Sequence, residues 1–373
     1  MDSFAFIIHP IDPKRDVSRK FPLLGRILTE RQIDFFSTFF PPVYISEVEG
    51  ISSVATGRRI KGWFLACPYT PKRMMELPER TVYHKIVQTG HMAEKLGAQI
   101  LGLGAFTSVV GDAGLTIAKQ LEIPVTTGDS YTVSLAVQAI REAARLMDIP
   151  LSGATAAVVG ATGAIGRVCA ELLVCDVERL ILIARDGKKL EDLRNRLLVE
   201  APRAELVVST SMDSLAEAQM ILTVTSAIHD IIHPEHLRPG SVVCDVARPR
   251  DVSAMVAAAR DDILVIDGGM VDVPGPVNFH FDFGFPEGKA YACMAETMAL
   301  ALEGRFEDYT IGKDITLERV REITTVAEKH GFRLSGFRSF EREVTEEQIE
   351  SVRRNARRVD ATRRAPAWEM RRV

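Results

Sequence analysis

The second part of the chain, from Gly153 onward, alternates short apolar runs with loops or segments of helical period. The runs predict six strands, at residues 155–160, 179–184, 204–208, 219–224, 241–245 and 263–266. Crossover connections between such strands produce a parallel sheet. The pattern therefore predicts an α/β fold with a doubly wound, parallel Rossmann sheet.

Residues 1–150 alternate in a similar way, which predicts a second, N-terminal α/β domain. Strands are expected at residues 4–8, 44–48, 61–66, 98–103 and 124–127, and helices at 17–28, 30–39, 81–96 and 131–147. The last of these helices carries the chain into the Rossmann domain.

After the sixth strand, residues 270–288 form an irregular, proline-containing loop, and helical patterns follow at 289–303 and 317–330. Thr316 and Gly331 cap the second of these helices, and Thr345 caps a third. The predicted division is therefore an N-terminal α/β substrate domain at 1–150 and a Rossmann NADP-binding domain at 151–288. C-terminal helices follow at 289–340, and a charged helix with a basic tail at 341–373.

The stretch from Ala156 to Arg167 reads AAVVGATGAIGR, a buried strand that runs into a glycine turn and a helix. Its GxxGxxG spacing is a variant of the GxGxxG dinucleotide fingerprint. Glycines let the backbone approach a pyrophosphate, and the free N–H groups of the helix face that anion. The alternative is a plain glycine-rich turn. The residues expected to bind the cofactor are Gly160, Thr162, Gly163, Ala164, Ile165 and Gly166.

The second strand of the predicted sheet ends at Arg185. An arginine there accommodates a 2′-phosphate, whereas a site for NAD usually places an acidic residue to bind the ribose 2′-hydroxyl. The sequence therefore favours NADPH, with the alternative that Arg185, beside Asp186, merely begins a helix. Further candidates for cofactor contact at the strand ends are Thr225, Ser226 and Gly268.

Two loops of the N-terminal domain place small hydroxyl residues just after predicted strands, the edge where open α/β sheets bind ligands. Their side chains are suited to bind a substrate carbonyl or the nicotinamide amide, and equally suited to cap helices and turns. These residues are Thr107, Ser108, Thr127 and Ser130.

Among the five cysteines, Cys293 stands near the beginning of the helix expected at 289–303. A thiol there feels the positive end of the helix dipole, which favours the thiolate. Cys293 is therefore the candidate nucleophile, and a buried core cysteine is the alternative. Core-facing or strand positions are expected for Cys169, Cys175 and Cys244, while Cys67 is ambiguous.

The composition of the chain bears on its expected cellular compartment and on the kinds of site it could contain. Five cysteines without CxxC or CxxH spacing argue against a disulfide framework or a metal site, and for a reducing compartment. The N-terminal residues lack the pattern of a signal peptide, and no apolar run is long enough to span a membrane. Basic and aromatic residues are not interleaved in the body of the chain. We therefore expect a cytoplasmic protein without a nucleic-acid partner.

Several separated motifs carry a family resemblance. The run AYACMAETM at 290–298 precedes LEG at 302–304, DITLE at 314–318 and KHGF at 329–332. Upstream lie FTS at 106–108, TTG at 126–128, the glycine turn, the segment 180–185 and DGG at 267–269. In this order the motifs resemble the cyanobacterial long-chain acyl-[acyl-carrier-protein] reductases, which form fatty aldehydes.

The resemblance implies an NADPH-dependent, two-step reduction of an acyl thioester carried by acyl carrier protein or coenzyme A. The family's catalytic cysteine corresponds to Cys293, which would attack the thioester and form an acyl-enzyme. Hydride transfer gives a hemithioacetal that collapses to aldehyde and thiolate. The oxyanion formed on the way needs hydrogen-bond donors, and Ser130 and Thr127 are the candidates.

This chain departs from the family pattern in two places. Family members carry Asn-Thr-His where this chain has Asp129, Ser130 and Tyr131, so a role for that imidazole does not transfer. The loop before Cys293 also differs, with an aromatic run at 279–283. Two other classes therefore stay open: an NADP-dependent dehydrogenase of a small hydroxy or amino acid, and a nucleotide sensor without turnover.

From Arg353 onward the chain carries eight arginines against two acidic residues, a net charge of +6. One hypothesis is that this tail contacts an acidic surface, either acyl carrier protein or an anionic membrane, with Trp368 as an interfacial anchor. The alternative is a solvated tail without a partner.

Overall fold

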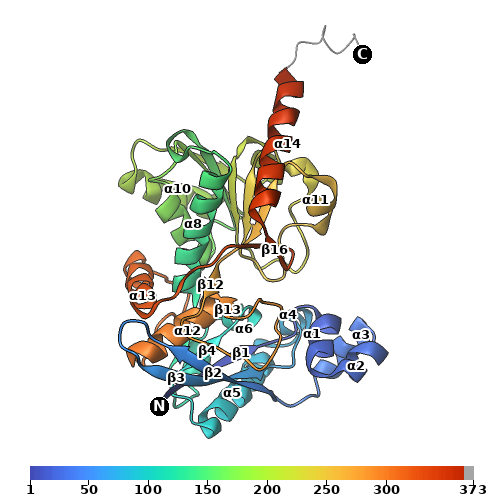
Figure 1. Ribbon diagram of the computed structural model, residues 1–373, viewed down its shortest axis with the longest axis vertical. Helices are drawn as coiled ribbons and strands as arrows, with labels where there is room; N and C mark the ends of the chain where they lie inside the picture. The colour runs from blue at the N-terminus through green and yellow to red at the C-terminus, as the bar shows by residue number, and fades with distance from the viewer. Residues whose placement is uncertain (365–373) are drawn as a thin grey trace. The chain divides into compact units, whose positions relative to one another are not determined.

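A computed structural model describes residues 1–364, with side chains to Val359 (Figure 1). The chain divides into two compact units. Unit 1 comprises Met1–Leu135 and Gly269–Ser335, and unit 2 comprises Ala136–Gly268 and the chain from Gly336 onward. These boundaries differ from the expected ones at 150 and 288. One helix contributes to both units, and the chain returns to unit 1 directly after the last strand of the six-stranded sheet of unit 2.

The sheet of unit 1 has five strands in the order β2-β3-β1-β4-β5. Strands β1, β3, β4 and β5 are parallel, and β2 is antiparallel to β3. The carboxyl ends of the parallel strands therefore meet at one edge, where the loops with candidate residues begin. The strands are β1 (Asp2–Ile8), β2 (Val43–Ser52), β3 (Arg59–Ala66), β4 (Leu101–Leu103) and β5 (Val125–Thr126).

Helices connect these strands, and one expected helix is divided. Pro22 has no N–H and disfavours a helical residue before it, so the helix expected at 17–28 becomes α1 and α2, interrupted at Phe21. The helices before the crossing to unit 2 are α1 (Pro13–Lys20), α2 (Pro22–Ile27), α3 (Glu30–Ser37), α4 (Pro71–Glu76), α5 (Glu79–Leu96), α6 (Phe106–Val109), α7 (Leu115–Ala118) and α8 (Asp129–Leu146).

The returning segment of unit 1 contains a small antiparallel sheet of β12 (Met270–Asp272), β13 (Lys289–Tyr291) and β14 (Arg333–Leu334). The loop expected at 270–288 therefore begins with a strand. The helix expected from 289 begins at 292 as α12 (Ala292–Glu303), because the preceding residues pair with β12. Helix α13 (Leu317–His330) has the expected caps, Thr316 and Gly331.

Unit 2 is the predicted parallel sheet, in the strand order β11-β10-β9-β6-β7-β8. This is the Rossmann order, with the strand before the glycine turn in the middle. The strands are β6 (Thr155–Val159), β7 (Arg179–Ile183), β8 (Glu205–Ser209), β9 (Met220–Thr223), β10 (Val242–Asp245) and β11 (Leu264–Asp267). The helices between them are α9 (Ala164–Leu173), α10 (Gly187–Glu200) and α11 (Ala254–Ala259), with the short 3-10 helices η2 (Met212–Glu217) and η3 (Pro234–His236). A further 3-10 helix, η1 (Leu151–Gly153), precedes β6.

The end of the described chain is a hairpin, β15 (Phe337–Ser339) and β16 (Arg342–Val344), followed by α14 (Glu346–Arg364). Thr345 caps α14 as expected, since its hydroxyl accepts the N–H of Gln348 at 3.2 Å. The rest of the expected basic tail, including Trp368, lies outside the described residues. Among residues 1–364, none of the helices is long and apolar enough to cross a bilayer.

Candidate active site

The glycine turn of unit 2 has a backbone that only glycine accommodates. Gly160 has a φ of +81°, and Gly163 is the N-cap of α9. A Cβ atom at Gly166 would overlap the carbonyl of Gly160. Because the first-turn N–H groups of a helix have no acceptor inside it, this backbone cradle fits a pyrophosphate. The other residues of the turn that are expected to bind the cofactor are partly exposed: Thr162, Ala164 and Ile165.

The candidates at the strand ends of unit 2 separate into two kinds. Ser226 is exposed and Gly268 is partly exposed. Thr225 instead holds its own loop, because its hydroxyl donates to Asp251 Oδ1 at 2.5 Å and its N–H to Oδ2 at 3.0 Å. Thr223 also donates to Asp251, at 2.5 Å. The side chain of Thr225 is therefore engaged in the fold.

Arg185 follows β7, where a cofactor's ribose lies in Rossmann domains. It is exposed and forms no ion pair with any residue of the described chain. Asp186 caps α10 instead, since its Oδ1 accepts the N–H groups of Lys188 at 3.1 Å and Lys189 at 3.2 Å. The carboxylate of Asp186 is therefore engaged in capping α10.

A buried carboxylate surrounded by arginines precedes Gly268. Asp267 Oδ2 accepts a hydrogen bond from Arg338 Nε at 2.8 Å, and Arg250 pairs with the same carboxylate. Burial raises the pKa of Asp267, but Arg248, Arg250 and Arg338 together hold it below its usual range. This cluster ties the hairpin β15–β16 to the end of β11 and so fixes the backbone before Gly268.

In unit 1, Cys293 is the second residue of α12 and is half-buried. Cys67, Cys169 and Cys244 are buried. The prediction for Cys175 was wrong: it is exposed, because α9 ends at Leu173 and Cys175 lies beyond its last turn.

Gly128 lies directly against the backbone of Cys293. A Cβ atom at residue 128 would overlap the Cα, Cβ and O atoms of Cys293, and Gly128 has a φ of +76°. Both observations require glycine here. The loop between β5 and α8 therefore packs against the first turn of α12 without an intervening side chain.

Glu296 holds this packing together. It lies one turn after Cys293 and is fully buried. Its Oε1 accepts the Thr126 hydroxyl at 2.5 Å, and its Oε2 accepts the N–H of Tyr131 at 2.8 Å. Burial raises the pKa of Glu296, although these hydrogen bonds oppose the increase. One carboxylate thus joins α12 to both ends of the loop that contains Gly128.

The electrostatics of the thiol differ from the expectation. Burial and the nearby Asp129 carboxylate raise the pKa of Cys293 to about 12, and the backbone at the start of α12 lowers it by less. Burial, together with Glu296, also raises the pKa of Asp129 to about 7. The expectation of a thiol shifted towards the thiolate was therefore wrong, because burial and Asp129 outweigh the effect of the helix end. The resting site contains a protonated thiol beside a carboxyl group that titrates near neutrality.

The two hydroxyls expected to donate to an oxyanion have different surroundings. Ser130 is buried, and its Oγ accepts a hydrogen bond from Thr310 at 2.8 Å, a contact that does not use the O–H of Ser130. Thr127 is also buried, and no residue of the described chain lies at full hydrogen-bonding geometry to its Oγ1. Its hydroxyl is close enough to Asp129 to act on that carboxyl as a hydrogen-bond donor, which lowers the pKa of Asp129. Both hydroxyls of this loop therefore remain candidates as donors, and that of Thr127 interacts with the Asp129 carboxyl.

In the loop after β4, the hydroxyl side chains cap a turn, which was the alternative to binding a ligand. Thr107 Oγ1 donates to the carbonyl of Gly104 at 2.8 Å and accepts its N–H at 3.0 Å. Ser108 donates to Ala105 O at 2.6 Å. Both hydroxyls therefore close their own turn.

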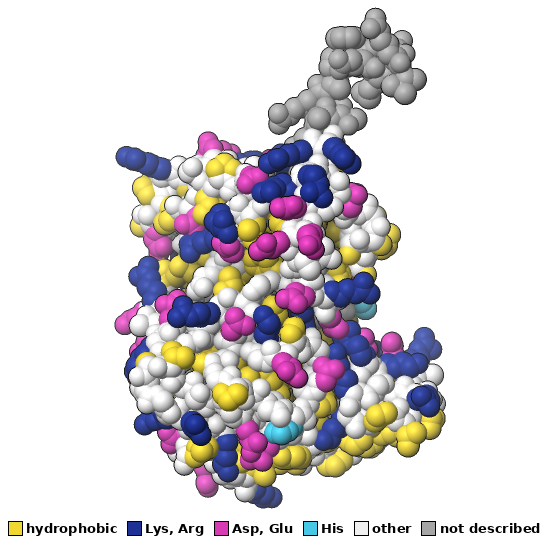
Figure 2. All heavy atoms as spheres, viewed as in Figure 1, with side chains coloured by type: hydrophobic (Ala, Val, Ile, Leu, Met, Phe, Trp, Pro, Cys, Tyr) yellow, Lys and Arg dark blue, Asp and Glu magenta, His cyan; other side chains and the backbone are white. Residues whose placement is uncertain are grey.

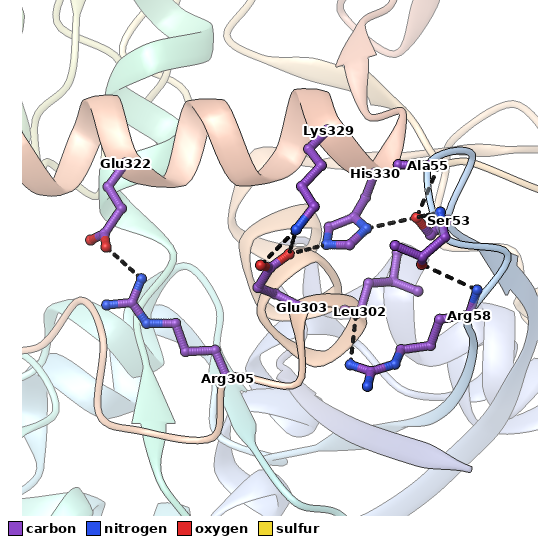
Figure 3. Close-up of polar contacts among 10 residues, drawn as sticks. Ser53, Ala55, Arg58, Leu302, Glu303, Arg305, Glu322, Lys329 and His330 are labelled. Carbon is purple, nitrogen blue, oxygen red and sulfur yellow. Dashed lines mark hydrogen bonds and ion pairs between the residues drawn. The ribbon is translucent and has the colours of Figure 1, made fainter.

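A second polar cluster fixes the other end of α12 (Figure 3). His330 Nε2 lies 2.6 Å from Glu303 Oε2, and His330 Nδ1 lies 2.7 Å from Ser53 Oγ. Ser53 Oγ also accepts the N–H groups of Ala55 and Thr56, and Lys329 Nζ lies 2.8 Å from both Glu303 oxygens. Although a Ser–His–Glu arrangement can activate a nucleophile, this serine oxygen is buried and saturated. The cluster therefore joins α12 and α13 to the loop after β2.

Glu296 and Asp129 were not predicted as site residues. A glutamate inside a helix that is apolar on every side was an available signal, because an unpaired buried carboxylate is costly. Asp129 was visible only as a departure from the family pattern.

Comparisons with known proteins cover both units. The sequence pattern of the shikimate / quinate 5-dehydrogenase family matches residues 141–267, which lie in unit 2. Aminotransferase PigE of Serratia sp. (strain ATCC 39006) is 30% identical over 357 residues, 94% of this chain and 42% of that protein. The chain thus spans about two fifths of the length of that relative.

A second relative matches over nearly its whole length. The long-chain acyl-[acyl-carrier-protein] reductase of Synechococcus elongatus is 30% identical over 346 residues, 88% of this chain and 98% of that protein. Among solved structures, L-tryptophan dehydrogenase from Nostoc punctiforme is 15% identical, with a TM-score of 0.39 over 98% of this chain and 89% of the other. That score is too low to show a common overall fold.

Replacing Gly128 by alanine tests the contact with Cys293. We expect G128A to lower the free energy of unfolding by about 1–2 kcal/mol for the positive φ and by about 1–3 kcal/mol more for the overlap. Gly57, which also has a positive φ but no atom within 4 Å, provides the matched control. Chemical denaturation should show a clearly smaller loss for G57A. Equal losses in the two variants would mean that the loop and α12 do not pack as described.

Proposed function

The chain belongs to the family of the long-chain acyl-[acyl-carrier-protein] reductase, and from that membership we propose that it reduces an acyl thioester to an aldehyde through Cys293. Family membership and the Rossmann sheet make it an NAD(P)-dependent oxidoreductase. The observation that carries the finer proposal is the placement of Cys293, held at the start of α12 against a glycine beside a titratable carboxyl.

The first step is a thiol–thioester exchange, in which the acyl group moves from the carrier sulfur to Cys293. The Cys293 sulfur attacks the thioester carbonyl, the bond to the carrier sulfur breaks, and the carrier leaves as a thiol. The proton lost by Cys293 is the one that the leaving sulfur needs. A group that accepts the first proton and returns it to the second sulfur therefore serves both halves of the exchange.

Asp129 is suited to move that proton. The residue before it contacts the Cys293 backbone, and its carboxylate is close enough to raise the thiol pKa. With a pKa of about 7, Asp129 is a usable base and acid near neutral pH. A thiol with a pKa of about 12 stays protonated until substrate arrives, so attack is coupled to proton transfer.

The second step reduces the acyl-enzyme. A bound reduced nicotinamide would supply a hydride to the acyl carbon. The negative charge on the carbonyl oxygen then needs a donor, and the buried hydroxyls of Thr127 and Ser130 are the ones this loop offers. Ser130 supports the loop through Thr310. Collapse of the hemithioacetal releases the aldehyde and returns Cys293 as a thiolate, which Asp129 or water protonates.

We assign NADPH as the preferred cofactor, held at its pyrophosphate by the Gly160–Gly166 turn. Arg185 is exposed and forms no ion pair with a residue that the structure describes, while Asp186 caps α10. An acyl carrier protein or coenzyme A carries the acyl group in this proposal.

Trapping the acyl group tests the proposal most simply. Incubation with acyl-coenzyme A or acyl carrier protein, without NADPH, should add one acyl mass to the intact protein. The adduct should be absent in Cys293→Ala and present in Cys175→Ala, which removes the exposed cysteine as a control. Adding NADPH should then release aldehyde. If no adduct forms while a keto acid oxidises NADPH, the chain is instead a dehydrogenase with direct hydride transfer.

The role of Asp129 predicts a specific pH dependence. The acylation rate should rise with pH through about 7, because the carboxylate form accepts the thiol proton. D129N should lose this inflection and about 100-fold in rate. Stopped-flow acylation across pH provides the measurement, and D314N, which changes an exposed carboxylate of unit 1, provides the control. A D129N profile that keeps the inflection would exclude Asp129 as the base.

Cofactor preference depends on Arg185. R185A should weaken NADPH binding about 10- to 100-fold, the value of a charge-assisted contact to phosphate, and leave NADH binding unchanged. R196A, which removes an exposed arginine of α10, should change neither affinity. Fluorescence titration measures both cofactors. An equal loss for NADPH and NADH in R185A would contradict the assignment.

A further inference from the structure

Exposed apolar side chains are concentrated in one short stretch of unit 1. Eight of the sixteen large hydrophobic side chains that are exposed in the described chain lie between Phe21 and Tyr44. Leu23, Ile27 and Phe39 are each at least 70% exposed. We call the following residues the apolar patch: Phe21, Leu23, Ile27, Phe35, Phe36, Phe39 and Phe40.

Helix α3 exposes two aromatic side chains beside a buried carboxylate. It buries Ile33, Asp34 and Ser37 and exposes Phe35 and Phe36. The buried aspartate is bonded to the Thr70 hydroxyl, and its backbone carbonyl accepts a hydrogen bond from Arg73 Nε at 3.1 Å. The helix therefore cannot rotate its phenylalanines inward without breaking these contacts. The exposure of the rings is built into the fold.

The rings are also ordered among themselves. Phe35 contacts Phe36 and Phe39 edge to face, with ring centroids 5.5 Å apart in each pair. Lys85 Nζ donates to the carbonyl of Phe40 at 2.8 Å and holds the segment after α3. An ordered apolar surface loses little conformational entropy when it is covered.

Unpaired cations accompany the patch. Lys14, Arg26 and Arg31 are exposed and form no ion pair with a described residue, and Glu30 is the exposed acidic residue near them. Figure 2 shows hydrophobic side chains gathered where α2 and α3 lie in Figure 1, with lysine and arginine side chains beside them. Two copies of this surface would bring like charges together, which disfavours a symmetric dimer.

We propose that the apolar patch and these cations dock the protein on the surface of an anionic lipid bilayer. Phenylalanine, leucine and isoleucine enter the boundary between headgroups and acyl chains, and lysine and arginine remain at the phosphates. Neither α2 nor α3 is long enough to span the bilayer, so the segment lies on it. This inference does not depend on the chemistry proposed for Cys293.

Vesicle co-sedimentation of the full chain tests the proposal. Binding should be strong to vesicles of phosphatidylcholine mixed with phosphatidylglycerol, weaker to phosphatidylcholine alone, and reduced by salt. F35S/F39S should lower the partition coefficient by about tenfold or more. R26E/R31E should lower it by about tenfold or more on the anionic vesicles and have little effect on the neutral ones.

Matched controls keep the result specific. V199S/M255S removes two exposed apolar side chains of unit 2 and should bind vesicles as the wild type does. Thermal unfolding and turnover of soluble acyl-coenzyme A should be unchanged in F35S/F39S. Equal loss in F35S/F39S and V199S/M255S would overturn the proposal. It would also be overturned if the wild type did not bind vesicles but sedimented as a dimer that F35S/F39S dissociates.

Discussion

The buried carboxylate of Glu296 is the interaction on which the candidate active site depends. A fully buried carboxylate is costly unless it is hydrogen-bonded, and Thr126 and the N–H of Tyr131 supply those bonds. Because Glu296 lies one helical turn after Cys293, the same contact that satisfies the charge places the backbone of Cys293 against Gly128. The cluster of Glu303, His330 and Ser53 fixes the opposite end of α12. Cys293, the proposed nucleophile, therefore stands on a helix held at both ends.

The thiol shows how burial and a single neighbouring charge can outweigh a helix end. The backbone at the start of α12 does lower the thiol pKa, but burial and Asp129 raise it further. Under the proposed function, the cysteine reacts only when a partner removes its proton, and Asp129, which raises the thiol pKa, is the group proposed to do so. A cysteine kept neutral in this way is less open to oxidation, because oxidants attack the thiolate.

The features of the fold that were predictable from the sequence are those set by residues close together in the chain. Six strands and a glycine turn follow from periodicity and spacing, and the structure confirms all of them. The break at Phe21 was also local, but the apolar pattern across Pro22 concealed it. The partners of Glu296 and Ser130 were not predictable, because they lie between 165 and 180 residues away in the chain. Only the folded sheet brings the end of β5 to α12.

The central claim is that the acyl group passes through Cys293 on its way to aldehyde. The most direct measurement isolates the acylated protein, free of thioester substrate, and then adds NADPH alone. The account predicts that aldehyde forms in an amount equal to the acyl groups bound, and at the rate of steady-state turnover. If the isolated acyl-protein is inert to NADPH while free thioester is still reduced, the covalent route through Cys293 is contradicted.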